Sequence, residues 1–176
     1  MPDAHPIQVR EWNFHMHSSP DGLRWKLFAQ LNPGRGGWDT QSIAFWDHNR
    51  ERYALYTRYW MSHRHGTAKA PDNFRTVRRL ESDDLKSWDK QSIVIGPDEA
   101  DRTLHPTPPG QPSVDYYGAA VFRYAEADRT YIMLAQAFWH WKPRAPRKGL
   151  GPAGFDVRLA VSRDGRKFRR VGGRKP

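Results

Sequence analysis

The sequence predicts an all-β fold, a partial β-propeller of about two complete four-stranded antiparallel blades plus half a blade. A phrase of the form Ser-x-Asp-(Gly/Leu)-x-x-aromatic occurs at 19–25, 82–88 and 162–168. A longer run that opens on an aspartate precedes the last two phrases, by 43 residues from Asp39 to Ser82 and by 47 residues from Asp115 to Ser162. Repetition at such intervals, with apolar strands in between, is typical of propeller blades.

Each blade is expected to contain four strands in the same order. Short runs rich in β-branched and aromatic residues, separated by polar turns, indicate the first three strands. The Ser-x-Asp phrase then makes a tight turn into a short fourth strand that carries the aromatic residue. The predicted first, second and third strands are 40–46, 52–60 and 74–81 in one blade, and 118–124, 130–139 and 155–161 in the next.

The ends of the chain are expected to hold incomplete units. Residues 8–18 resemble a third strand with no first or second strand before it. The predicted organisation is a single partial domain, with a half blade and connection at 1–38, a blade at 39–114 and a blade at 115–176. Because a propeller closes with about four to eight blades, a fragment is expected. The alternative is a short product that covers its open blade edges by self-association.

Composition narrows the classes of function. The chain has 176 residues, no cysteine, 8 tryptophans and an aromatic content of 13%. A mean hydropathy of −0.89 leaves no segment apolar enough to span a bilayer, so no membrane partner is expected. Without cysteine there is no disulfide or thiolate metal site, and no cofactor is expected. The first residues lack the pattern of a secretory signal, and the localisation stays open.

The formal net charge is +10. The basic residues are spread over strands, turns and the tail, and they are densest at 75–79, 142–148 and 163–175. Such runs are most often solvated surface. Binding of an acidic polysaccharide is the functional alternative. A nucleic acid is the less favoured partner, because net charge alone suggests it.

Two aspartates are the candidate catalytic residues. In an antiparallel blade, the first strand starts at the end where the second strand finishes and the third begins. First strands line the channel of a propeller, so Asp39 and Asp115 are expected to face one funnel. Two carboxylates at a cavity are the minimum for a glycosidase, one as acid and one as base or nucleophile. The alternative is that each aspartate only caps the start of its strand.

The same end of the blades is expected to collect side chains that suit a sugar. Indole rings can stack on apolar sugar faces, and imidazole and guanidinium groups can hydrogen-bond hydroxyls. The tryptophans have the alternative role of packing between blades, because aromatic residues on strands are more often core. The predicted substrate-binding residues are Gln41, Trp60, His63, Arg75, Trp139, His140, Trp141 and Asp156.

Two further patterns are assigned no chemistry. The Ser-x-Asp turns lie at the opposite end of the blades, where their side chains are expected to bond turn backbone. The pairs His15/His17 and His63/His65 each place two imidazoles on one strand face. Without a carboxylate at a suitable spacing, no metal site is predicted for them.

Several of these segments resemble a known superfamily, the five-bladed β-propeller hydrolases that include glycoside hydrolase families 32 and 43. The resemblance covers nearly the whole chain and is closest to uncharacterised bacterial proteins allied to family 32. The segments that carry it are 39–47, 52–56, 78–88 and 156–165.

The resemblance implies a complete fold of five blades and hydrolysis of glycosidic bonds. In that superfamily, acidic residues on the inner strands of successive blades serve as nucleophile or base, stabiliser and general acid. Asp39 and Asp115 match the inner-strand positions, whereas the expected acid glutamate has no counterpart, since Glu81 and Glu126 fall at a strand end and in a turn. The function expected is that of a glycosidase-like protein with a carbohydrate substrate. The alternative is a non-catalytic propeller that binds a glycan or another acidic polymer.

Overall fold

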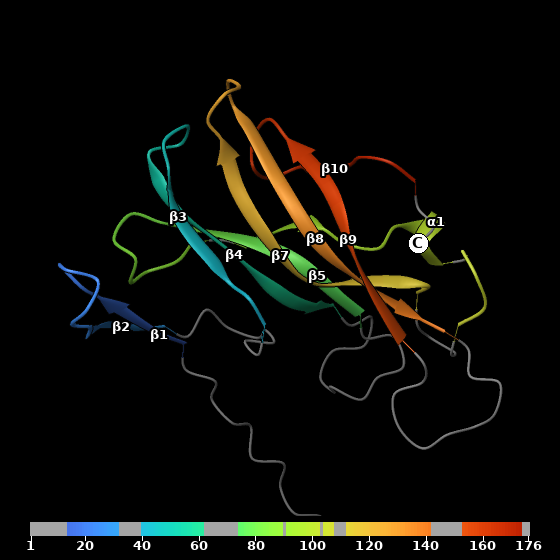
Figure 1. The fold of residues 1–176 in the computed structure, drawn as a ribbon, viewed down its shortest axis with the longest axis horizontal. Coiled ribbons are helices and arrows are strands. Elements are labelled where there is room, and N and C mark those ends of the chain that lie inside the picture. Colours follow the sequence, from blue (N-terminus) through green and yellow to red (C-terminus); the bar gives the residue numbers. More distant parts are fainter. Residues whose placement is uncertain are drawn as a thin grey trace, which may run out of the picture. The chain divides into compact units, whose positions relative to one another are not determined.

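The computed structural model describes residues 14–31, 40–61, 74–89, 91–102, 104–107, 112–141 and 153–173. The chain divides into two compact units, residues 1–34 and residues 35–176. Figure 1 traces the strands of both units along the sequence.

The first unit contains a β-hairpin. Strand β1 (Phe14–Ser18) pairs antiparallel with β2 (Lys26–Leu31), with an irregularity between Met16 and His17. The first Ser-x-Asp phrase forms the connection, as predicted. The described part of the predicted 8–18 strand is therefore confirmed, while residues 8–13 lie outside the described part of the chain.

The second unit contains two four-stranded antiparallel sheets and a short helix. In each sheet the strands lie side by side in chain order, from β3 to β6 and from β7 to β10. We call these the first sheet and the second sheet. The elements are β3 (Ile43–Asp47), β4 (Arg52–Met61), β5 (Phe74–Ser82), β6 (Ser92–Ile95), α1 (Glu99–Arg102), β7 (Val114–Tyr124), β8 (Thr130–His140), β9 (Ala153–Ser162) and β10 (Arg169–Arg170).

The strand predictions are confirmed for the first three strands of each sheet, with shifted ends. The largest shift is at β7, which begins at Val114 rather than at residue 118. The prediction for the fourth strands was wrong in one respect. Trp88 and Phe168 precede β6 and β10 instead of lying in them. The last residues of each phrase complete the turn. The fourth strand therefore begins to pair with the third strand only after the aromatic residue.

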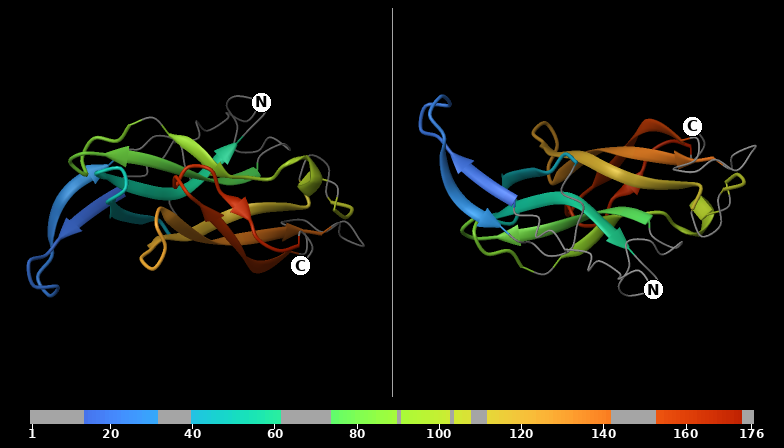
Figure 2. Two further views of the ribbon diagram at one scale, coloured as in Figure 1. Left: turned by 90° about the horizontal axis from the view of Figure 1, so that it is seen from above. Right: turned by 90° about the horizontal axis from the view of Figure 1, so that it is seen from below.

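The all-β class is confirmed. Among the described residues there are three antiparallel sheets, counting the hairpin, and none of the three is closed. The two four-stranded sheets of the second unit form two layers that face each other, as Figure 2 shows. Strand β7 lies next to β3, β4 and β5 of the first sheet.

The core lies between these two layers. On β8, alternate residues turn to this side, as the two-residue period of a strand requires. They are Tyr131, Met133, Ala135, Ala137 and Trp139, and each is at most 2% exposed. Alanine occupies two of the five positions, and Tyr56 and Val77 of the first sheet belong to the same core. Small residues opposite large ones allow two layers to pack at the density of a protein interior.

The predicted structural role of the Ser-x-Asp turns is confirmed. In the second copy, Asp84 Oδ1 accepts hydrogen bonds from the backbone N–H groups of Lys86 and Ser87, both at 2.8 Å. The third copy repeats this pattern around Asp164. The turn also requires a left-handed residue, which is Gly165 (φ 68°) in the third copy and Leu85 (φ 62°) in the second. These carboxylates therefore hold the turn backbone.

The turns give the fold an acid-sensitive component. The backbone N–H groups of Ser87 and Lys86 lower the pKa of Asp84 below its ordinary value. A carboxyl whose pKa is lower in the folded state stabilises the fold above its unfolded pKa of about 4 and loses this effect as the pH falls through its folded pKa. We expect Asp84→Ala to have a lower melting temperature than the parent at pH 7. The difference should shrink below about pH 4, and a constant difference would contradict the assignment.

Candidate functional site

An ion pair joins the two sheets at the end where β7 begins. Asp115 is 1% exposed, and its Oδ2 accepts hydrogen bonds from the Arg75 side-chain Nε and from the Arg75 backbone N–H, each at 2.9 Å. Strand β5 presents Arg75 here because this residue pairs with Trp60 near the end of β4. His140 lies beside them, with Nε2 3.3 Å from Asp115 Oδ1 in a geometry that is not aligned for a hydrogen bond.

Aromatic rings surround this ion pair. The Arg75 guanidinium lies 4.1 Å from the centre of the Phe138 ring, 5.0 Å from Tyr117 and 5.5 Å from Trp60. Arg58, two residues before Trp60 on the same strand, lies 4.5 Å from the Tyr117 ring, and burial lowers its pKa. Guanidinium groups stack favourably on aromatic faces, above all where water is excluded.

The rings also reach the surface. Trp60 is 41% exposed and Phe155 is 60% exposed. Phe155 meets Tyr117 edge to face at 5.4 Å, next to a hollow of about 350 Å³ that Tyr117, Gln136, Phe155, Asp156 and Val157 line. An apolar ring face beside hydrogen-bonding groups is the arrangement that suits a sugar.

The predicted site residues are brought together in part. Trp60, Arg75, Asp115 and His140 form one cluster, which we call the aspartate–aromatic cluster together with Arg58, Tyr117 and Phe138. Asp156 lines the neighbouring hollow, and its carboxylate pairs with Arg158 at 2.6 Å. Gln41 is exposed, at the chain segment that leads into β3.

Trp139 and Trp141 both lie on the core side, and their rings stack with centres 6.0 Å apart. Trp139 lies on the opposite strand face from Phe138 and is buried in the core, which is the alternative role named for it above. Trp141 packs against that core and stacks on His105, with ring centres 4.2 Å apart. The two-residue period of a strand explains why Trp139 is separated from Phe138 and the aspartate–aromatic cluster, because neighbouring residues point to opposite faces.

Asp39 and His63 lie outside the described residues. The pairing of Asp39 with Asp115 therefore stays a prediction, as does a substrate contact from His63.

Three members of the cluster were not predicted: Arg58, Tyr117 and Phe138. Arg58 had a local signal, since residues two apart share a strand face and Trp60 was already assigned to the site. Tyr117 had no comparable signal. Strand β7 has an irregularity between Tyr116 and Gly118, and this irregularity changes the sheet face to which each side chain points. Bulges of this kind re-aim side chains and are not evident from periodicity.

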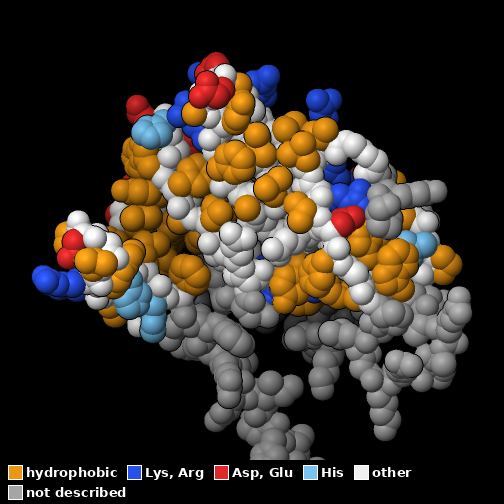
Figure 3. Space-filling view, viewed as in Figure 1, with side chains coloured by type: hydrophobic (Ala, Val, Ile, Leu, Met, Phe, Trp, Pro, Cys, Tyr) orange, Lys and Arg blue, Asp and Glu red, His pale blue; other side chains and the backbone are white. Residues whose placement is uncertain are grey.

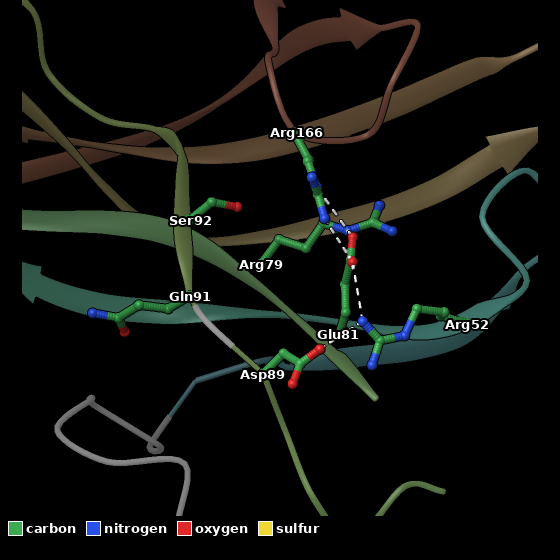
Figure 4. Close-up of a pocket in the computed structure, with 7 residues that line it drawn as sticks. All are labelled: Arg52, Arg79, Glu81, Asp89, Gln91, Ser92 and Arg166. Atoms are coloured by element: carbon green, nitrogen blue, oxygen red, sulfur yellow. Dashed lines mark hydrogen bonds and ion pairs between the residues drawn. The ribbon is translucent and has the colours of Figure 1, made fainter. Parts of the chain in front are cut away.

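A second polar cluster lies at the opposite end of the sheets. Figure 4 shows Arg52, Arg79 and Arg166 directed toward Glu81, in a hollow of about 450 Å³. Glu81 accepts hydrogen bonds from Arg79 at 2.9 Å and from Arg166 at 2.6 Å. Burial opposes ionisation of Glu81, but the hydrogen bond from Arg166 and the charge of Arg79 outweigh it, and the pKa of Glu81 is lowered.

The charges in this hollow satisfy one another. Arg52 binds Asp83 and Asp89 as well as Glu81, and Arg79 binds Asp47. The cluster therefore joins β5 to the turn that carries Arg166. We assign it a structural role.

Within the described ranges, no group of three or more His, Asp or Glu side chains is placed to hold a metal ion. His15 and His17 have ring centres 6.4 Å apart. None of the helical residues that the structure describes forms a helix long and apolar enough to cross a membrane.

Comparison with known proteins gives no relative: no family model, no curated protein and no solved structure matches the chain.

Proposed function

We propose that the second unit is built from two successive blades of a β-propeller. The support is the shared strand order of the two sheets and the position of β7 against β3, β4 and β5. The registers support the same idea, because Tyr53 pairs with Ser82 in the first sheet and Tyr131 with Ser162 in the second. Both Ser-x-Asp phrases of the second unit thus begin opposite the tyrosine near the start of the second strand.

On this fold we propose a carbohydrate-active protein of the glycosidase kind, with its sugar site at the aspartate–aromatic cluster. The observation that carries the proposal is a buried carboxylate, Asp115, held by Arg75 beside the partly exposed rings of Trp60 and Tyr117. The rings would stack on a sugar face, and the charged groups would orient its hydroxyls.

In this arrangement Asp115 is held in place by Arg75. Its Oδ2 accepts two hydrogen bonds, from the side-chain Nε and from the backbone N–H of Arg75. A glycosidase needs a second carboxyl group on the other side of the scissile bond. Asp39 is the residue we propose for it, on the basis of the matched runs that begin at Asp39 and Asp115.

A second candidate function is glycan binding without catalysis. The observation in its favour is that Asp115 is almost fully buried and engaged by Arg75, so it offers little surface to a reacting atom. The exposed ring of Trp60 would then provide the main contact with the glycan.

A pair of tryptophan variants tests the sugar site. Trp60 and Trp46 are 41% and 39% exposed, and only Trp60 belongs to the aspartate–aromatic cluster. We expect Trp60→Ala to weaken binding of a glycan found by array screening by about 10-fold, the loss of one stacking contact of about 1.4 kcal/mol. Trp46→Ala should leave the affinity unchanged. Equal losses in both variants, measured by calorimetry, would argue against this site.

Turnover of chromogenic glycosides separates the two candidate functions. If the chain is a glycosidase, the parent protein hydrolyses one of them and Asp39→Asn abolishes hydrolysis while glycan binding persists. Binding with no turnover by the parent would favour the non-catalytic function. Asp39→Asn is preferred over a change at Asp115, whose loss would leave the buried Arg75 guanidinium without its partner.

A further inference from the structure

One face of the second sheet carries a continuous set of uncovered apolar side chains. It is the face turned away from the first sheet, where residues 132, 134, 136 and 138 of β8 point. Hydrophobic side chains are spread over β7, β8 and β9 in Figure 3. We define the outer apolar face by its members that are 39% to 63% exposed, namely Phe122, Tyr124, Leu134, Phe155, Val157, Leu159 and Val171.

The register of the strands places these residues on one face. Phe122 pairs with Ile132, and Leu134 pairs with Leu159. Phe155 pairs with Phe138, and the backbone N–H of Val171 bonds to the carbonyl of Leu159. Directly paired residues share a sheet face, so the seven side chains form one surface.

The equivalent face of the first sheet is buried. The two registers make Tyr56 correspond to Leu134 and Val77 to Val157. Tyr56 and Val77 are 0% and 1% exposed under the second sheet, whereas Leu134 and Val157 are 40% and 63% exposed. The face that the second sheet covers in the first sheet is therefore exposed in the second sheet. Of these two equivalent faces, the exposed one is the more apolar.

The size of the outer apolar face matches that of a dimer interface. With side chains of about 200 Å² each, the exposed fractions give on the order of 700 Å² per copy, close to the roughly 800 Å² per partner of a standard interface. It also exceeds the roughly 300–600 Å² that is usual for the largest patch of a monomer.

The face itself carries no charge that would oppose a like partner. None of the seven residues is charged, so two copies can bring these faces together without burying an ion. Arg163, Lys167 and Arg169 line a hollow beside Val161 at the turn end of the sheet, and they leave the centre of the face uncharged. Repulsion between these rims should weaken as salt screens it.

We propose that two copies of this chain associate through their outer apolar faces, in an isologous contact of sheet on sheet. Side chains such as Leu134, Val157 and Leu159 would interdigitate with their counterparts to form a second core. This inference does not depend on the proposed function, although Phe155 and Val157 also line the hollow beside the aspartate–aromatic cluster, so that pairing would cover this hollow.

Sedimentation velocity of the full chain tests the proposal. We expect a monomer–dimer equilibrium with a dissociation constant in or below the micromolar range, tightening as salt is raised. Leu159→Asp should be monomeric, because pairing would bury two carboxylates. Leu23→Asp, at an 84% exposed leucine of the hairpin turn, is the matched control and should remain dimeric. A parent chain that stays monomeric at about 100 μM, or a Leu159→Asp variant that still dimerises, would overturn the proposal.

Cross-linking gives an independent measurement that does not depend on a disruptive variant. The chain has no cysteine, so a single introduced thiol reports one position. Val157→Cys should give a covalent dimer with a short bismaleimide, and Leu23→Cys should not. Equal yields at both positions would contradict an interface at the outer apolar face. The proposal would also be wrong if the chain stays monomeric and a different protein binds this face.

Discussion

Replacing Asp47 with alanine is expected to lower the free energy of unfolding by about 3–5 kcal/mol, the usual cost of removing one partner of a buried ion pair. Asp47 and Arg79 are 0% and 1% exposed, and their salt bridge is 2.5 Å long. Asp47 also accepts a hydrogen bond from the Tyr131 hydroxyl of the second sheet. Without Asp47, the buried Arg79 guanidinium would keep its charge with Glu81 as its remaining ion-pair partner.

Asp83→Ala is the matched control for this prediction. Asp83 binds Arg52 at 2.7 Å, but its side chain is 77% exposed, so its removal should cost about 0–1 kcal/mol. Both values can be measured by urea unfolding followed through tryptophan fluorescence. Similar costs for the two variants would mean that the Asp47 pair does not carry the link between the sheets.

The contrast between these aspartates shows what the sequence could predict. Strands and turns depend on neighbours in the chain, so the Ser-x-Asp turns and the first three strands of each sheet were predicted from local patterns. The Asp47 pair joins residues that are 32 and 84 positions apart. No local pattern connects Asp47 to Arg79 or Tyr131, and their meeting depends on the way in which the two sheets pack.

The candidate site was predictable to the same extent. Strand direction correctly brought Trp60, Arg75, Asp115 and His140 to one end of the sheets. It did not identify Asp115 as the partner of Arg75, because two charged residues at one end can each face solvent. Alternation along β8 places Trp139 and His140 on opposite faces of the sheet. It does not say which of the two faces the core, because that depends on how the two sheets pack.

The second large effect is expected from Gly165→Ala, at about 2–4 kcal/mol. Gly165 has φ 68°, a left-handed conformation that costs an alanine about 1 kcal/mol or more. A Cβ atom there would come within 2.3 Å of Arg79 Nη1 and 2.8 Å of the Tyr56 hydroxyl. Arg79 cannot yield cheaply, because Asp47 and Glu81 hold its other nitrogens. Overpacking of this kind adds about 1–3 kcal/mol.

Gly172→Ala separates the two contributions. Gly172 has φ 91°, and a Cβ atom there would meet nothing within 4 Å, so only the backbone cost of about 1 kcal/mol is expected. If crowding at Arg79 accounts for the excess at Gly165, then Gly165→Ala and Asp47→Ala act on the same guanidinium. Their combined cost should therefore be smaller than the sum of the single costs, because Arg79 can move once Asp47 no longer holds it. Strict additivity would show instead that the turn and the buried ion pair stabilise the fold separately.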